Sequence, residues 1–175
     1  MDTGLLFEET LALVARIRER YAIEPIAVQP RLSLTGQADL YDEALWTRNP
    51  DLCCKLRKLE PQGAFLQHYD AWISGIRRDQ TKARSLVPVV TWDDQFELVK
   101  VSPFARWTEE MVWRYVRARD LPYNELHDRQ FPSVGCTPCT RSIRPGEGLH
   151  AGRWAGSEKI ECGLHVSLVS LGSAL

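Results

Sequence analysis

The chain has 175 residues, of which 44% are hydrophobic and 26% are charged, so it is long enough for one folded core and unlike a disordered chain. A formal net charge of −1 offers no basic field for nucleic acid. No apolar run approaches the ~18 residues of a membrane-spanning helix, and the N-terminal segment lacks the stretches of a signal peptide. We therefore expect a cytoplasmic single-domain protein that binds neither nucleic acid nor membrane, with homo-oligomerisation left open.

Helical periodicity and punctuation dominate the first part of the chain. Apolar residues at helical spacing predict a helix from Phe7 to Tyr21, and Ile26–Val28 ahead of a proline predicts a short buried strand. A second helix is expected over Gln37–Trp46. A third is expected from Asp51, as its cap, through Leu59, with two adjacent cysteines in its first turn.

The second part contains the β-rich runs. Strands are expected within Ala71–Ile76, Val87–Val90 and Phe96–Val101. Thr108 can cap a helix whose first turn is acidic, and the chain from Leu121 onward is rich in loops. Alternating helices and short strands predict an α/β fold with a mainly parallel sheet.

Five cysteines divide into a set of four and one more. Cys53 and Cys54 are adjacent, Cys136 and Cys139 form a Cys-x-x-Cys hairpin, and Cys162 stands apart in a Glu-Cys-Gly-Leu-His run. An odd count with an adjacent pair suits a disulfide framework poorly. Four thiolates on short segments suit an iron-sulfur cluster or structural zinc, although zinc sites usually show two Cys-x-x-Cys knuckles. The fifth thiol is then free to react.

This set of five cysteines, in this order and at about these separations, resembles the assimilatory adenylyl-sulfate reductases of bacteria and plants. The likeness runs from Met1-Asp2-Thr3-Gly4 to His165. It implies an adenine-nucleotide α-hydrolase-like parallel sheet with flanking helices, and a [4Fe-4S] cluster on the four paired cysteines. It also implies reduction of adenosine 5'-phosphosulfate in sulfate assimilation and cysteine biosynthesis, with thioredoxin as the reductant.

One part of the family pattern is missing. Members open with a strand and a Ser-Gly-Gly-x-Asp-Ser phosphate loop, and this chain contains no such run. We therefore expect a partial reductase domain over residues 1–165, without its first strands and phosphate loop, followed by a C-terminal tail over residues 166–175. Roughly the first third of a full-length member would be absent.

The resemblance assigns roles to individual side chains. Cys162 is the expected nucleophile and His165 a ligand of the substrate's oxygens. Lys58 matches a lysine between cluster and substrate. It follows the adjacent cysteines together with Lys55 and Arg57, for all of which a solvated basic helix face is the alternative.

An anionic phosphosulfate also needs guanidinium groups, whose planar fork matches its oxygens. Arg77 and Arg78 follow a predicted strand, and Arg153 lies in a Gly-Arg-Trp run; the family has substrate-binding arginines at such positions. A surface ion pair is the alternative for Arg78 and Arg153. His150 stands where members commonly carry another arginine, which predicts weaker anion binding at neutral pH.

Three functions stay open from the sequence alone. The first is thioredoxin-dependent reduction of adenosine 5'-phosphosulfate to sulfite and AMP through an S-sulfocysteine at Cys162. The second is an inactive truncated remnant that still binds a cluster. The third is a zinc-stabilised binding module without catalysis.

Overall fold

The structure, a computed structural model, describes residues 1–157, 159 and 161–165. Two compact units divide the chain. The first comprises Met1–Gln62 and Pro122–Gly163, and the second comprises Gly63–Leu121 and Leu164–Leu175. The expected tail over residues 166–175 lies outside the described residues. Each unit is considered by itself below.

Helices form the N-terminal half of the first unit. Helix α1 (Glu8–Tyr21) begins with two glutamates, which favour the positive end of the helix dipole, and ends at Ala22 in the left-handed region. Helix α2 (Leu34–Leu40) is capped by the Ser33 hydroxyl, which accepts from the Gly36 amide at 3.0 Å. Helix α3 (Leu45–Arg48) is short.

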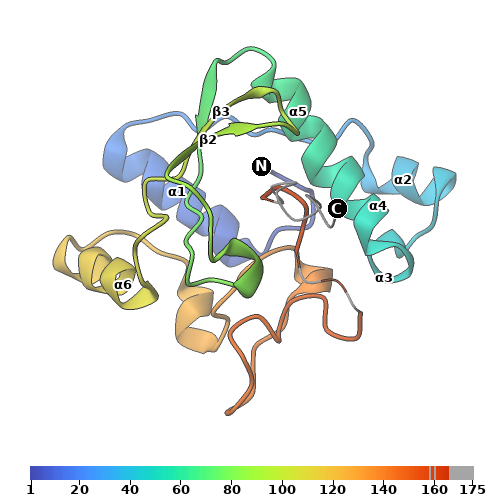
Figure 1. Cartoon of the computed structure of the whole chain (residues 1–175). Coiled ribbons are helices and arrows are strands. Elements are labelled where there is room, and N and C mark those ends of the chain that lie inside the picture. Colours follow the sequence, from blue (N-terminus) through green and yellow to red (C-terminus); the bar gives the residue numbers. More distant parts are fainter. Residues whose placement is uncertain (158, 160, 166–175) are drawn as a thin grey trace, which may run out of the picture. The chain divides into compact units, whose positions relative to one another are not determined.

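The cysteine-bearing helix begins directly after α3. Helix α4 (Pro50–Cys54) continues into a π-helical segment, η1 (Lys55–Leu59), and then into α5 (Glu60–Leu66), as Figure 1 shows. A π-helical turn inside an α-helix is rare and is frequent at functional sites. The structure therefore marks this run as unusual immediately after its adjacent cysteines.

Three sequence predictions in this unit need correction. Ile26–Val28 is irregular instead of a strand. The Val28 carbonyl accepts a hydrogen bond from the Asp2 amide at 2.8 Å. The helix predicted over Gln37–Trp46 is broken in its middle, where an Asp42 carboxylate accepts from the Ala44 amide. The cap of α4 is Asn49 instead of Asp51, because Pro50 occupies the first helical position.

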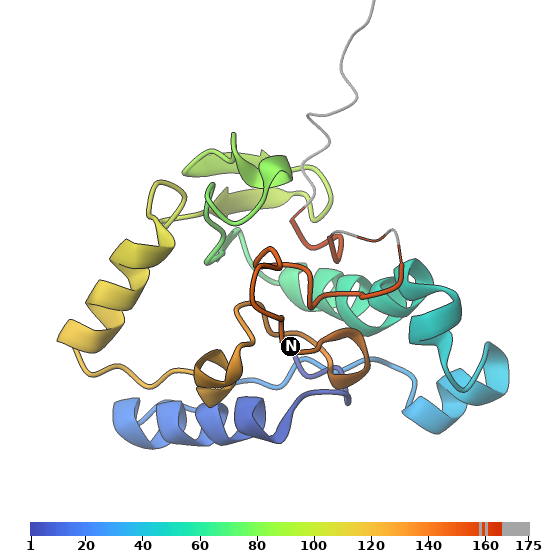
Figure 2. The same ribbon diagram turned by 90° about the horizontal axis from the view of Figure 1, so that it is seen from below.

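The C-terminal half of the first unit is mostly loop, as expected. It holds two 3₁₀ turns, η3 (Glu125–Arg129) and η4 (Thr137–Cys139). Figure 2 shows α1 beside η3. Side-chain contacts join them: Arg129 donates to Glu9 at 2.7 Å, Arg16 donates to Glu125 at 3.3 Å, and the side-chain amide of Asn124, ahead of η3, donates to the Thr10 hydroxyl at 2.9 Å.

The second unit contains a three-stranded sheet with the order β1-β3-β2. Strand β1 (Ala71–Ile73) runs parallel to β3 (Leu98–Val101), and β2 (Val90–Asp93) runs antiparallel to β3. The α/β class is confirmed, with a sheet that is mixed instead of mainly parallel. The strand expected over Val87–Val90 begins only at its last residue, because the Val87 amide closes a turn onto the Arg84 carbonyl.

Helix α6 (Glu109–Ala118) follows a 3₁₀ turn, η2 (Lys82–Arg84), and the sheet along the chain. It begins where the sequence predicts, with the Thr108 hydroxyl accepting from the Met111 amide at 3.2 Å. Among the described residues, no helix is long and apolar enough to cross a membrane.

The Thr108 cap can be tested by unfolding. Thr108→Ala removes the acceptor for an N-terminal amide of α6, and we expect the free energy of unfolding to fall by about 1 kcal/mol. Thr108→Ser keeps the hydroxyl and is the matched control, which should stay within about 0.5 kcal/mol of the parent in urea titrations. Equal losses in both variants would mean that the methyl group, not the cap, stabilises this end.

Candidate functional site

The four paired cysteines all lie in the first unit, on two supports. Cys53 and Cys54 are buried on α4. Cys136 pairs with Leu6 in an isolated β-bridge, and the Cys139 amide donates to the Cys136 carbonyl at 3.0 Å, which closes the hairpin as a 3₁₀ turn. The hairpin is therefore held against the N-terminal segment.

Burial is the main cause of the raised pKa values among these thiols. Burial and, after it, the neighbouring thiols of Cys54, Cys139 and Cys136 together raise the pKa of Cys53 to about 12. Burial also raises the pKa of Cys54 and of Cys139, with further contributions from other thiols of the set. Without a cation among them, the thiols of Cys53, Cys54 and Cys139 remain protonated at neutral pH.

The donor set fits a soft metal centre in its chemistry. Four largely buried sulfurs of one unit act on one another, and such a set is costly unless iron or zinc compensates its charge. Among the described residues, however, no three or more His, Cys, Asp or Glu side chains stand close enough to hold a metal ion as they are. The residues present fit a cluster in kind, and their sulfurs would have to close around it.

Arg57 is the main residue of this region that the sequence pattern undervalued. Its side chain is buried, not on a solvated face, and its Nε donates to the Thr3 carbonyl at 2.6 Å. Its Nη1 donates to the Gln37 side chain at 3.1 Å. The Thr3 hydroxyl lies 3.2 Å from the Cys136 sulfur. Burial lowers the pKa of Arg57, and Cys53 and Cys136 oppose that shift. Its position four residues after Cys53 is a helical spacing that could have pointed to it.

Two lysines act on the same thiols. Lys58, on η1, lowers the pKa of Cys54 and Cys139 against the larger effect of burial. Lys159 also lowers the pKa of Cys54, and its ammonium forms an ion pair with Asp51 and lies 5.6 Å from the Trp154 ring centroid. Lys159 was not among the residues expected from the sequence.

Arg153 lies beside the hairpin. Its guanidinium stands 4.3 Å from the Trp154 ring centroid and donates to the Ser133 hydroxyl at 3.2 Å, and it lowers the pKa of Cys139. Its buried Nε has no hydrogen-bond partner among the described residues. A Cβ at Gly135 would lie 2.3 Å from the guanidinium, so glycine makes room for it there. Neighbouring His150 contributes its backbone carbonyl to the Arg153 amide.

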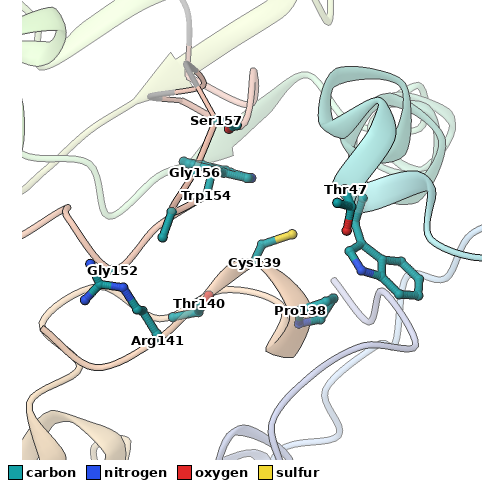
Figure 3. A pocket seen from close by; sticks show the side chains of 11 residues that line it. Thr47, Pro138, Cys139, Thr140, Arg141, Gly152, Trp154, Gly156 and Ser157 are labelled. Carbon is teal, nitrogen blue, oxygen red and sulfur yellow. The ribbon is translucent and has the colours of Figure 1, made fainter.

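A pocket of about 210 Å³ adjoins Cys139 in the first unit. Figure 3 shows the Cys139 sulfur pointing into the space between its own loop and the helix that carries Thr47. Trp154, Arg141 and Ser157 line the other parts of the wall. One side of the cysteine group is thus reachable from solvent.

Cys162 belongs to the first unit, near the cysteine set. It is half-buried, and its thiol raises the pKa of Cys54, which places the two sulfurs within electrostatic range. The next residue, Gly163, has a φ of +87°, and a Cβ there would lie 3.2 Å from Leu59. Gly163 therefore lets the chain turn directly after the expected nucleophile.

The remaining expected residues lie in the second unit. Arg77 pairs with Asp79 at 2.9 Å, and Arg78 donates to the Val87 carbonyl at 2.8 Å. His165 stacks on Trp72 with ring centroids 5.8 Å apart and planes 9° apart. The structure thus brings Cys53, Cys54, Cys136, Cys139, Cys162, Lys58 and Arg153 into one unit, and Arg77, Arg78 and His165 into the other.

Comparison with known proteins supplies the family. The phosphoadenosine phosphosulfate reductase domain matches residues 1–142. An adenosine 5'-phosphosulfate reductase of Shouchella clausii is 48% identical over 166 residues, covering 94% of this chain and 69% of that protein. Adenosine 5'-phosphosulfate reductase 2 of Bacillus subtilis is 49% identical over 168 residues, covering 94% and 70%.

A solved structure of a related reductase has a similar fold. The phosphoadenylyl-sulfate reductase of Candida auris, in a phosphate complex, has a TM-score of 0.68 at 26% identity, covering 81% of this chain and 68% of that one. The relatives that match this chain are named as reductases, so the chain falls in an oxidoreductase class. The chain belongs to the phosphoadenosine phosphosulfate reductase family.

Arg57 offers a stability test of the region. Arg57→Met leaves the Thr3 carbonyl and the Gln37 side chain without a donor, and we expect the free energy of unfolding to fall by about 2–4 kcal/mol. Exposed Lys55 on the same helical run gives the control, since Lys55→Met should change it by less than about 0.5 kcal/mol. Denaturant titration measures both. Similar small changes in the two variants would contradict a structural role for the guanidinium.

Proposed function

We propose that this chain reduces adenosine 5'-phosphosulfate to sulfite and AMP in sulfate assimilation, with thioredoxin as the reductant. The observation that carries the proposal is the grouping of four mutually coupled thiols with a fifth, Cys162, in one unit. Identity of 48–49% with adenosine 5'-phosphosulfate reductases supports the substrate. Five free thiols are typical of a reducing compartment and support a cytoplasmic location.

Cys53, Cys54, Cys136 and Cys139 are the proposed ligands of a [4Fe-4S] cluster. When bound, the cluster supplies positive charge that compensates four thiolates and ties α4 to the Cys136 hairpin. Burial raises the pKa of Cys54, and Lys58 and Lys159 already oppose that rise. We assign the four ligands a structural and electrostatic role, because the reaction below needs no electron from them.

Cys162 is the proposed nucleophile. Its thiolate attacks the sulfur of the phosphosulfate, an S–S bond forms, the S–O bond to phosphate breaks, and AMP leaves with the electron pair. A thioredoxin thiolate then attacks the cysteine sulfur of the S-sulfocysteine. Sulfite departs, and the second thioredoxin thiol resolves the mixed disulfide, which restores Cys162 and oxidises thioredoxin.

The cationic side chains are proposed to hold the anhydride. Arg153 combines a partly buried guanidinium with an unpartnered buried Nε, and Lys58 lies with it near Cys139. Arg77, Arg78 and His165 are also proposed to contact the substrate. His165 would do so as a neutral hydrogen-bond donor, since burial, Lys100 and Arg84 lower its pKa to about 3.

The cofactor can be tested by metal analysis. Protein purified without oxygen should be brown, with broad absorbance near ~400 nm and about four irons per chain. Cys136→Ser should bleach this absorbance and lower the melting temperature together, because cluster binding and folding are coupled. Cys162→Ser is the matched control and should keep the colour. One zinc per chain and no iron would instead support the zinc-stabilised module.

The nucleophile can be tested by mass spectrometry. After mixing with adenosine 5'-phosphosulfate and no thioredoxin, the protein should carry one sulfonate group on Cys162. Cys162→Ser should form no adduct and release no sulfite, because a serine hydroxyl is a far weaker nucleophile than a thiolate. A sulfonate on Cys53 or Cys139 would place the reaction elsewhere.

A further inference from the structure

Trp72 lies on the buried side of the small sheet in the second unit. Side chains alternate along a strand, so its neighbours Ala71 and Ile73 face the other way and are exposed. Trp72 pairs in register with Lys100 of β3, which is 4% exposed. A lysine this deeply buried needs compensation, and the sheet provides it beside Trp72.

Three contacts fix the Trp72 indole. Its Nε1–H donates to the Asp93 carboxylate at 3.2 Å, and its ring meets Phe96 edge-to-face at 5.8 Å. The Lys100 ammonium lies 4.7 Å from the indole centroid and 3.6 Å from the same carboxylate. The indole is therefore held by a hydrogen bond, an aromatic contact and a cation, each of which sets its plane.

His165 is the side chain that rests on this fixed ring. The imidazole and indole planes are nearly parallel, at 9°, with ring centroids 5.8 Å apart, so the two rings stack. The imidazole Nδ1 is buried without a hydrogen-bond partner among the described residues. Lys100 and Arg84 act on the ring together with burial to lower its pKa to about 3. The contact is thus made by a neutral, stacked ring rather than by an ion pair.

The contact between His165 and Trp72 restricts the movement of the residues that precede His165 in the chain. Three residue steps separate His165 from Cys162, so at about 3.6 Å per step the Cys162 Cα stays within about 11 Å of the His165 Cα. A fixed imidazole therefore limits the volume that the thiol can explore. Effective catalysis needs the attacking atom near its target, and small displacements reduce rates strongly.

We propose that Trp72 is a positioning residue: its indole, fixed by Asp93 and Lys100, seats the His165 ring and thereby limits how far the Cys162 thiol, three residues before it in the chain, can move. The proposal rests on the proposed role of Cys162 as nucleophile. Trp72 itself acts through His165 and contacts no reacting atom. The seat requires a planar side chain at position 165 and does not require a charge there.

The first test asks whether the seat exists in solution. Histidines labelled with ¹³C are followed by NMR across the pH range, with His165→Phe used to assign the His165 signal. In the parent protein this signal should not titrate between about pH 5 and 8, whereas in Trp72→Ala it should titrate near its ordinary pKa of ~6.5. Trp92→Ala is the control, because Trp92 lies on the same sheet, on the opposite face, and is 57% exposed.

The second test asks whether the seat serves the reaction, by comparing two rates at the Cys162 thiol. Trp72→Ala should slow formation of the sulfonate adduct at least about tenfold, because the thiol is no longer held. It should also speed alkylation by neutral iodoacetamide, because the half-buried thiol becomes more accessible. A merely destabilised protein would not change the two rates in opposite directions while keeping its brown colour. Trp92→Ala should leave both rates within about twofold.

His165→Phe separates the seat from substrate binding. A phenyl ring can still stack on Trp72, so alkylation of Cys162 should stay at the parent rate even if adduct formation falls. If Trp72→Ala does not fold, His165→Phe tests the proposal in its place. Alkylation of Cys162 faster than in the parent would then overturn the proposal, and alkylation at the parent rate would support it.

The outcomes distinguish this proposal from the one it rests on. No adduct on Cys162 in the parent protein would overturn the nucleophile assignment, and the positioning role with it. A parent that forms the adduct, beside a Trp72→Ala that forms it equally fast, would overturn the positioning role alone. Titration of His165 near 6.5 in the parent would show that the imidazole is not seated.

Discussion

The cost of burying several thiols in one place governs the first unit. Burial raises the pKa of Cys53, Cys54 and Cys139, and neighbouring thiols raise it further, so these three stay protonated unless cations compensate them. The surrounding residues follow from that constraint. Arg57 is buried, and its charge interacts with Cys53 and Cys136. Lys58 and Lys159 lower the pKa of Cys54, and Arg153 lowers the pKa of Cys139. Four cationic groups thus offset the cost of burying these thiols.

The second unit also contains a buried ionisable group whose charge must be compensated, although the groups differ. There a cation, Lys100, is buried, and a carboxylate and an indole ring compensate it. The ring that compensates the lysine also stacks with the imidazole of His165. A single aromatic side chain thereby links a buried ion pair of the sheet to the segment that follows the expected nucleophile.

The cap of α6 was predicted correctly, because Thr108 forms a purely local hydrogen bond, whereas the cap of α4 was not. The four-plus-one division of the cysteines rests on spacing alone and stays a prediction. Ile26–Val28 failed because apolar content alone does not supply a strand partner. Arg57 was expected beside the adjacent cysteines, with a solvated helix face as the alternative, but neither its buried contacts nor those of Trp72 were predicted. Their roles depend on Thr3, Gln37, Asp93 and His165, which are distant in sequence, and no local pattern reports such contacts.

The π-helical segment after Cys54 has a consequence for how this helix tolerates change. A π turn holds one residue more than an α turn, so deleting one residue from Lys55–Leu59 would let the helix become regular throughout. Each residue of an α-helix turns the chain by about 100°, however, so the first turn of α5 would then face a different direction relative to Cys53 and Cys54. The irregular turn therefore sets the angular phase between the thiols and the helix that follows. A regular α-helix over this segment would therefore lose the present alignment between the two cysteines and α5.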